Sequence, residues 1–184
     1  FDVTINETGA NQLIIFSSSI ANLGVGDEIA VFDLNGLQNS GDCSSEIGEI
    51  LVGAGKWQGE QLEISGIGSI DNCSVGGSQM AGYVEENAII VRVWDHSESK
   101  EYETTFTFSE GNNIFTTPGP TVITSLNLLG CTDNTACNYD PAAMENDDSC
   151  EYPIDLDWCD CVGNVLDECG ICGGPGATDG LCPD

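Results

Sequence analysis

The sequence predicts an all-β protein: an antiparallel β-sandwich, of jelly-roll or immunoglobulin-like arrangement, followed by a small, irregular, disulfide-rich tail that binds calcium. Three observations carry this prediction. Short runs of β-branched and aromatic residues recur through residues 1–129, between turns rich in Gly and Asn. No segment has sustained helical periodicity. Residues 130–184 hold eight of the ten cysteines, thirteen acidic residues and no Lys or Arg.

The first half of the expected sandwich contains five strand candidates. The first two are short β-rich runs separated by turn residues, and the third follows a Gly-Val-Gly-Asp turn. The last two flank a turn around Trp57. These five segments are residues 3–5, 13–16, 28–32, 50–54 and 61–64.

The second half contains four more candidates, residues 88–94, 102–108, 114–115 and 122–128. The apolar run at 88–94 is typical of a central strand. Residues 102–108 alternate Thr with aromatic side chains at a period of two, which predicts a strand with two different faces. Pro118 and Pro120 interrupt the last hairpin, because proline has no N–H to donate to a ladder.

The β domain is expected to end near Gly130, where the apolar periodicity stops. Two tail modules follow, residues 130–153 and 154–184. The first contains three cysteines and the second five, so full oxidation requires at least one bridge between them. So many thiols in a short Gly-rich stretch indicate disulfides and therefore an oxidising compartment. The cysteines expected in disulfides are Cys43, Cys73, Cys131, Cys137, Cys150, Cys159, Cys161, Cys169, Cys172 and Cys182.

The acidic side chains of the tail are candidate calcium ligands. Calcium takes six to eight oxygens, and disulfides would force these carboxylates together. The spacing is not that of an EF-hand loop, and a solvated acidic linker is the alternative. The candidates are Asp133, Asn138, Asp140, Asp147, Asp148, Asp155, Asp157, Asp160 and Asp167.

Cys169 and Cys172 form a Cys-x-x-Cys run, which suggests three readings. A zinc site requires a second such hook or histidines, and the only histidine, His96, lies in the other domain. A redox motif requires a βαβ context that is not visible here. Structural disulfides are the favoured reading.

Several residues of the β domain are also candidates for sites. Cys43 and Cys73 are expected to bridge, since both lie in Gly- and Ser-rich loops. A second metal site near them would use Asp33, Asn35, Asp42 and Asp71, although ordinary polar loop residues are the favoured reading. Trp57 and Trp94 fit a carbohydrate-stacking platform or, more commonly, a sandwich core. His96 is expected in a surface turn.

The sequence resembles a known group of proteins at three places. Residues 130–153 resemble the Cys- and Asp-rich repeats of large secreted surface proteins of Bacteroidota and relatives, which are akin to thrombospondin type 3 calcium repeats. Residues 167–174 resemble the "DECGVCGG" element that follows those repeats. Residues 26–33, with 51–54, Trp57 and 91–95, resemble a β-sandwich domain common in them. This resemblance implies a modular, exported surface or filament protein. Relative to that domain, residues 34–49, which include Cys43, are an insertion.

The net charge of −28 argues against nucleic acid and anionic membrane surfaces as partners, and no apolar run approaches the length of a membrane span. No Gly-x-Ser-x-Gly element or phosphate loop is present, and we expect no enzyme. The chain opens on Phe1 without a signal peptide. This fits a mature extracellular or cell-surface protein, or alternatively a fragment boundary.

The leading functional expectation is an extracellular structural subunit that self-assembles into a filament or surface layer, with calcium and disulfides stabilising it. Strand addition is one way to join copies. Residues 1–6 have strand character, and they could pair within their own domain or add to a neighbouring copy. The alternatives are an adhesion or carbohydrate-binding module of a larger secreted protein, with a glycan as ligand, and a non-catalytic appendage of a secreted enzyme. A binding module would expose Trp57, Trp94 or Tyr83, whereas a structural subunit would bury them.

Overall fold

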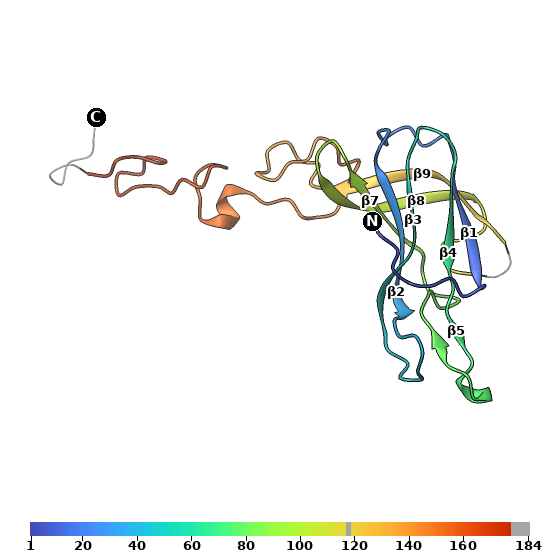
Figure 1. Cartoon of the computed structure of the whole chain (residues 1–184). Helices are drawn as coiled ribbons and strands as arrows, with labels where there is room; N and C mark the ends of the chain where they lie inside the picture. The colour runs from blue at the N-terminus through green and yellow to red at the C-terminus, as the bar shows by residue number, and fades with distance from the viewer. Residues whose placement is uncertain (117–118, 178–184) are drawn as a thin grey trace. The chain divides into compact units, whose positions relative to one another are not determined.

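The computed structural model describes residues 1–116 and 119–177, and Figure 1 shows the path of the chain. The chain divides into two compact units, Phe1–Leu128 and Leu129–Asp184. The long strands are β1 (Asn11–Phe16), β2 (Glu28–Leu37), β3 (Ile47–Lys56), β4 (Leu62–Ile67), β7 (Ile90–Asp95), β8 (Lys100–Glu110) and β9 (Thr121–Gly130). The short strands are β5 (Ile70–Asp71), β6 (Gln79–Met80) and β10 (Glu145–Asn146).

The all-β class is confirmed, but the main sheet is mixed and nearly closed into a barrel, so it is not clearly the expected antiparallel sandwich. The strand order is β3-β2-β7-β8-β9-β1-β4. β1 pairs with β9 in parallel, with Ile14 opposite Thr121, and with β4 antiparallel. This parallel pairing joins strands from both ends of the domain into one coiled sheet (Figure 1).

The two outer strands of this sheet, β3 and β4, approach each other closely, because β3 carries glycine at the contact. A Cβ at Gly53 would lie 2.6 Å from Cγ2 of Ile64 and 3.2 Å from the carbonyl oxygen of Ser65. A Cβ at Gly55 would lie 3.1 Å from both methyl carbons of Leu62. The close contact between β3 and β4, called the seam below, therefore requires glycine at these positions of β3, because any side chain would keep the two strands apart.

Three expected elements differ in the structure. Residues 3–5 form no strand, and residues 114–115 contribute only an isolated bridge between Ala88 and Ile114. The stretch 34–49 is not a simple loop: β2 continues to Leu37 and β3 already begins at Ile47. Shifts in the β2–β3 register absorb its extra residues.

The core of the first unit lies between the inward faces of these strands. Fully buried side chains include Ile29 and Val31 of β2, Val93 of β7 and Ile123 of β9. Alternating burial along β1 follows the strand period of two. The ring of Tyr83 stacks on Phe115 at 4.3 Å between centroids and 6° between planes. The core therefore also includes side chains from the irregular segments between β6 and β7 and between β8 and β9.

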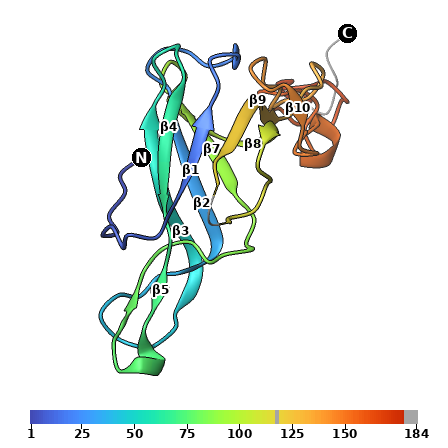
Figure 2. The same ribbon diagram turned by 90° about the vertical axis from the view of Figure 1, so that its right-hand side faces the viewer.

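An arm formed by β5 and β6 extends beyond the main sheet, with the 3₁₀ turn η1 (Cys73–Val75) at its tip. Figures 1 and 2 show the loop that follows β2 beside this arm. In the second unit, β10 pairs in parallel with the end of β9, with Glu145 opposite Leu129. The 3₁₀ turn η2 (Pro153–Leu156) lies farther along this unit.

Candidate functional site

The cysteines of the arm form the expected bridge. Cys43 and Cys73 are bonded with their Cα atoms 6.0 Å apart, and this bond ties the β2–β3 loop to η1. Beside it lies Gln79 of β6, whose side chain is 3 % exposed. The disulfide therefore holds together two loops that no continuous ladder of backbone hydrogen bonds connects.

Gln79 is the centre of a polar network that sequence reasoning missed. Its Nε2 donates to Ser45 Oγ at 2.8 Å and to Asp71 Oδ2 at 3.0 Å. Its Oε1 accepts from Asn39 Nδ2 at 3.1 Å and from the Ser45 N–H at 2.9 Å. The amide thus uses both donors and both lone pairs. A lone Gln in a Gly- and Ser-rich stretch gives no sequence signal of this role.

The four expected ligands of a second metal site lie in two separate networks. Asp71 of the arm bonds directly to Gln79, and Asp42 lies in the loop beside the arm, where its Oδ1 accepts from Asn39 Nδ2 at 2.7 Å. Asp33 is buried, and its carboxylate accepts from the N–H groups of Asn35 and Val84, both at 2.8 Å. It also accepts from Asn87 Nδ2 at 2.9 and 3.0 Å. Asp33 therefore joins β2 to the loop at 84–87.

Five aspartates of the tail share one local geometry. In each case a carboxylate oxygen accepts the N–H of the residue two positions later, which is an Asx turn. Nine aspartates within residues 1–116 and 119–177 do this, five of them in the tail. The tail pairs are Asp133 with Thr135, Asp140 with Ala142, Asp147 with Ser149, Asp160 with Val162, and Asp167 with Cys169.

Further hydrogen bonds order several of these tail loops. The two oxygens of Asp167 also accept from the N–H groups of Ile171 at 2.9 Å and Gly176 at 3.0 Å. Asp160 Oδ2 accepts from Asn164 Nδ2 at 2.6 Å. The amide of Asn138 closes another loop, since its Oδ1 accepts from the Glu151 N–H at 2.8 Å.

These contacts lower the pKa of several tail carboxyls. The N–H of Ile171, followed by those of Gly176 and Cys169, holds the pKa of Asp167 below its ordinary value, against the opposing effect of burial. The Asn164 side chain is the main cause of the lowered pKa of Asp160. Donated hydrogen bonds favour the ionised form, and the carboxylates are therefore stabilised as acceptors within their own loops.

The remaining expected ligands are dispersed. Asp148 accepts from Asn146 Nδ2 at 3.2 Å, Asp155 lies in the first turn of η2 and Asp157 ends it. In the described part of the chain, no three Asp, Glu, Cys or His side chains come together as a metal-binding group. Calcium binding stays a prediction, and no step below depends on a bound ion.

Disulfides join the loops of the tail into one unit. The bridges are Cys131–Cys150, Cys137–Cys161 and Cys159–Cys172, with Cα separations of 4.8, 4.9 and 5.6 Å. The Cys137–Cys161 bridge connects the two expected tail modules, as their odd cysteine counts required. Cys169 is also disulfide-bonded, whereas Cys182 lies outside the described residues.

The Cys-x-x-Cys run does not act as a pair in this structure. Cys172 is bonded to Cys159, thirteen residues earlier, and its neighbour Cys169 belongs to a different bridge. A dithiol redox motif closes its bridge within the run, and a zinc hook requires free thiolates. The oxidised arrangement therefore favours the structural reading.

The aromatic residues proposed for a glycan platform are mostly inside the protein. Trp57 is 1 % exposed and Tyr83 is 2 % exposed, which confirms the core role expected for Trp57. Trp94, on β7, is half-buried. His96 is exposed in the turn after β7, as expected, and its backbone N–H donates to Asp27 Oδ1 at 3.0 Å.

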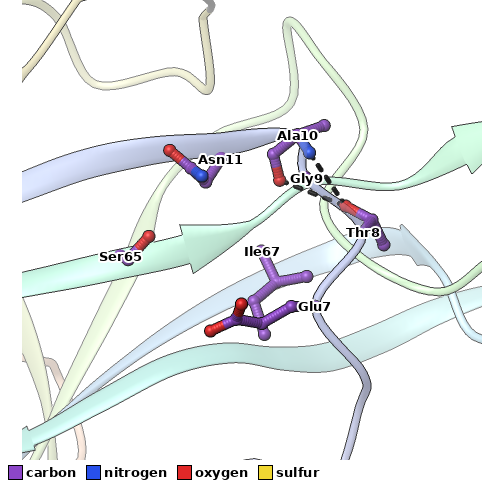
Figure 3. A pocket seen from close by; sticks show the side chains of 7 residues that line it. All are labelled: Glu7, Thr8, Gly9, Ala10, Asn11, Ser65 and Ile67. Carbon is purple, nitrogen blue, oxygen red and sulfur yellow. Dashed lines mark hydrogen bonds between the residues drawn. The ribbon is translucent and has the colours of Figure 1, made fainter.

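The hollow shown in Figure 3 lies where the chain enters β1 and faces β4. Its volume of about 120 Å³ is well below the roughly 300–1,000 Å³ of typical small-molecule sites. The backbone N–H of Ala10 donates to the Thr8 hydroxyl oxygen at 3.2 Å, and that hydroxyl donates to the carbonyl of Gly68. The hollow therefore arises from the way the chain turns into β1, and it offers little room for a ligand.

Comparisons with known proteins give no relative: no family model, no curated protein and no solved structure matches this chain. Within residues 1–116 and 119–177, no helix has the length and apolar character to cross a membrane.

Proposed function

We propose that this chain is an extracellular structural protein whose copies assemble into a filament or a surface layer. The observation that carries the proposal is the burial of Trp57 and Tyr83, at 1 % and 2 % exposed. A glycan-binding module uses exposed aromatic side chains as a stacking surface, whereas a structural subunit packs them in its core. Of the three candidate aromatic residues, Trp57, Tyr83 and Trp94, only Trp94 is partly accessible to solvent.

The disulfides are a second support. Four described bridges hold the arm and the tail, both of which have little apolar core of their own. Cross-linking of this density is typical of secreted domains that must persist outside the cell. The proposal includes no catalytic step, and the single histidine has only a turn position.

The net charge of −28 sets a condition on assembly. Copies of a strongly acidic protein repel each other over roughly a Debye length, about 10 Å at 0.1 M salt. Divalent cations, calcium above all, reduce this repulsion most effectively because they associate with carboxylates. We therefore propose that assembly depends on calcium.

Electron microscopy of the unreduced protein tests the proposal, first with millimolar calcium and then after chelation. Filaments or layers that dissolve on chelation would support it in full. Filaments that persist after chelation would support assembly but show that it does not depend on calcium. Discrete monomers under both conditions would overturn the proposal and favour the adhesion or carbohydrate-binding alternative, for which a glycan screen is the next measurement.

A further inference from the structure

Residues 1–7 belong to no strand, and the chain bends at Ile5. Burial alternates along them: Phe1, Val3 and Ile5 are half-buried and the residues between them are exposed. Within the described ranges, residues 2–7 form no hydrogen bond between their backbone and any other backbone group. The segment is therefore held on the domain by side chains, without the ladder that fixes a strand of the sheet.

The surface under the start of this segment belongs to β2 and β3. The ring of Phe1 meets the ring of Phe32 at 6.0 Å between centroids and 79° between planes, an edge-to-face contact. Phe1 also lines a hollow of about 150 Å³ with residues of both strands. We call this surface the Phe32 face, and its members are Glu28, Phe32, Ala54, Gly55 and Lys56.

The Phe32 face is built for an aromatic partner. The Arg92 guanidinium lies 4.6 Å from the centroid of the Phe32 ring, and it is held there by two hydrogen bonds of 2.8 and 2.9 Å to Glu49. Phe32 itself is only 8 % exposed with Phe1 in place. Removal of the segment would uncover an ordered apolar surface on β2, because the ring under Phe1 is positioned by other contacts.

Within the described residues, the hydrogen bonds of residues 1–7 are limited to the one that the ammonium of Phe1 donates to Glu28 Oε2, and the next anchor along the chain is Thr8. The Thr8 hydroxyl bonds to the carbonyl of Gly68 and to the N–H of Ala10, and the latter contact is drawn in Figure 3. The backbone of Ala10 accepts from the Gly68 N–H at 2.8 Å. Detachment of residues 1–7 would therefore leave β1 and its register unchanged.

We propose that residues 1–7 exchange between copies, so that the segment of one copy lies on the Phe32 face of the next. This inference rests on the proposed function and names the surface that joins the copies. An exchanged segment makes the same contacts as a resident one, so exchange loses no interaction. Each copy donates one segment and accepts one, which generates an open chain when the rotation between copies does not close.

The first test uses a full chain with the apolar side of the segment removed, Phe1→Ser with Val3→Ser and Ile5→Ser. A synthetic peptide of residues 1–7 is titrated into it at up to millimolar concentration and followed by amide NMR, with a scrambled peptide as control. We expect saturable shifts confined to the Phe32 face and its neighbours. Added Phe32→Leu should weaken peptide binding about three- to tenfold, the range of an aromatic pair. No shifts at this face would overturn the inference.

The second test measures assembly by sedimentation and electron microscopy. The same apolar triple variant should remain monomeric, while a matched polar triple variant, Asp2→Ser with Thr4→Ser and Asn6→Ser, should assemble like the unmodified chain. If the apolar triple variant still assembles, the exchange is wrong and the structural function stands. If the unmodified chain itself never assembles, both are wrong.

Discussion

The hydroxyl of Tyr152 donates a 2.7 Å hydrogen bond to Oδ2 of Asp133, nineteen residues earlier in the chain. The other oxygen of Asp133 accepts from the N–H and hydroxyl of Thr135 at 2.9 and 2.7 Å. The Cys131–Cys150 bridge closes the same loop. One carboxylate therefore joins both ends of a tail loop that has almost no apolar core.

Substitution Tyr152→Phe should raise the pKa of Asp133 toward its ordinary value. The Thr135 N–H is the largest cause of the lowered pKa, and the Tyr152 hydroxyl is the next. The rise should therefore be partial. Carboxyl NMR titration measures it, and Tyr139→Phe, which alters an exposed tyrosine of the same tail, is the matched control. An unchanged titration of Asp133 would show that the phenol contact does not form in solution.

The Asx turns predict a difference between two substitutions at Asp167. Asp167→Asn retains an oxygen that can accept from Cys169 and Ile171, so the loop should keep its amide protection. Asp167→Ala removes every acceptor, and hydrogen exchange at these amides should become faster by tenfold or more, as expected for loss of about 1.4 kcal/mol or more of local stability.

Asp155→Ala is the control for this pair, since that side chain lies in η2 and outside the Asp167 loop. Equal exchange in the Asn and Ala variants would contradict the Asx-turn role. Calcium titration of the same variants tests the predicted calcium binding separately from the Asx turn, because Asn is a much weaker ligand for calcium than Asp but an adequate acceptor in a turn.

Acid should loosen the tail loops before it unfolds the β domain. The pKa values of Asp133, Asp160 and Asp167 are all lowered by donated hydrogen bonds. A lowered folded-state pKa contributes stability that is present above the unfolded value, about 3.9, and is lost as the pH falls through the folded value. Amide spectra of the tail should therefore remain constant down to about pH 5 and change below about pH 4.

The disulfides remain closed in acid, so the change should reverse fully on return to neutral pH. Core amides of β2 and β7 serve as the internal reference. Simultaneous loss of core and tail signals would show that the two units do not titrate separately.

The Gln79 network predicts a stability cost in the first unit. Gln79→Ala removes four hydrogen bonds and leaves the amide of Asn39, which is 8 % exposed, without this partner. We expect the free energy of unfolding to fall by about 1–3 kcal/mol, the cost of unsatisfied buried polar groups. Urea denaturation measures this value.

Gln61→Ala is its control, because Gln61 is exposed and bonds only to Glu63 among the described contacts. A change within about 0.5 kcal/mol is expected there. Similar values for both variants would indicate that the arm is open in solution.

The seam between β3 and β4 predicts that Gly53→Ala is costly. The added methyl would lie 2.6 Å from Cγ2 of Ile64 and 3.2 Å from the backbone oxygen of Ser65. Overpacking of this kind typically costs about 1–3 kcal/mol. Gly66→Ala on β4 is the matched control, since its nearest contact would be 3.6 Å. Equal thermal midpoints of the two variants would mean that the sheet is more open than this structure.

Local sequence patterns predicted most of the secondary structure. The runs at 13–16, 28–32, 50–54 and 102–108 all lie in strands, because alternation and β-branching act within a few residues. The run at 3–5 does not, although its composition is equally β-rich. A strand requires a partner edge, and in the described part of the chain no backbone hydrogen bond joins residues 3–5 to such an edge.

The candidate sites were less predictable. Asp33 and Asp42 lie only nine positions apart in the sequence, yet Asp33 binds the loop at 84–87 and Asp42 binds Asn39 in the loop beside the arm. Spacing alone suggested a shared site, and it could not show that each carboxylate is already used by a nearby N–H. Gln79 carries no sequence signal, because its four hydrogen bonds go to residues of two remote segments, the loop between β2 and β3 and the strand β5.

The sequence by itself determined the all-β class, the stapled acidic tail and the need for a bridge between its two modules, because composition, local periodicity and cysteine parity require no knowledge of distant contacts. Only the tertiary structure decided the parallel pairing of β1 with β9, the separation of Cys169 from Cys172 and the burial of Trp57. Each of these depends on which remote segments meet. Which segments meet is decided by packing of the whole sheet and by closure of the whole loop, and no short stretch of residues determines either of these.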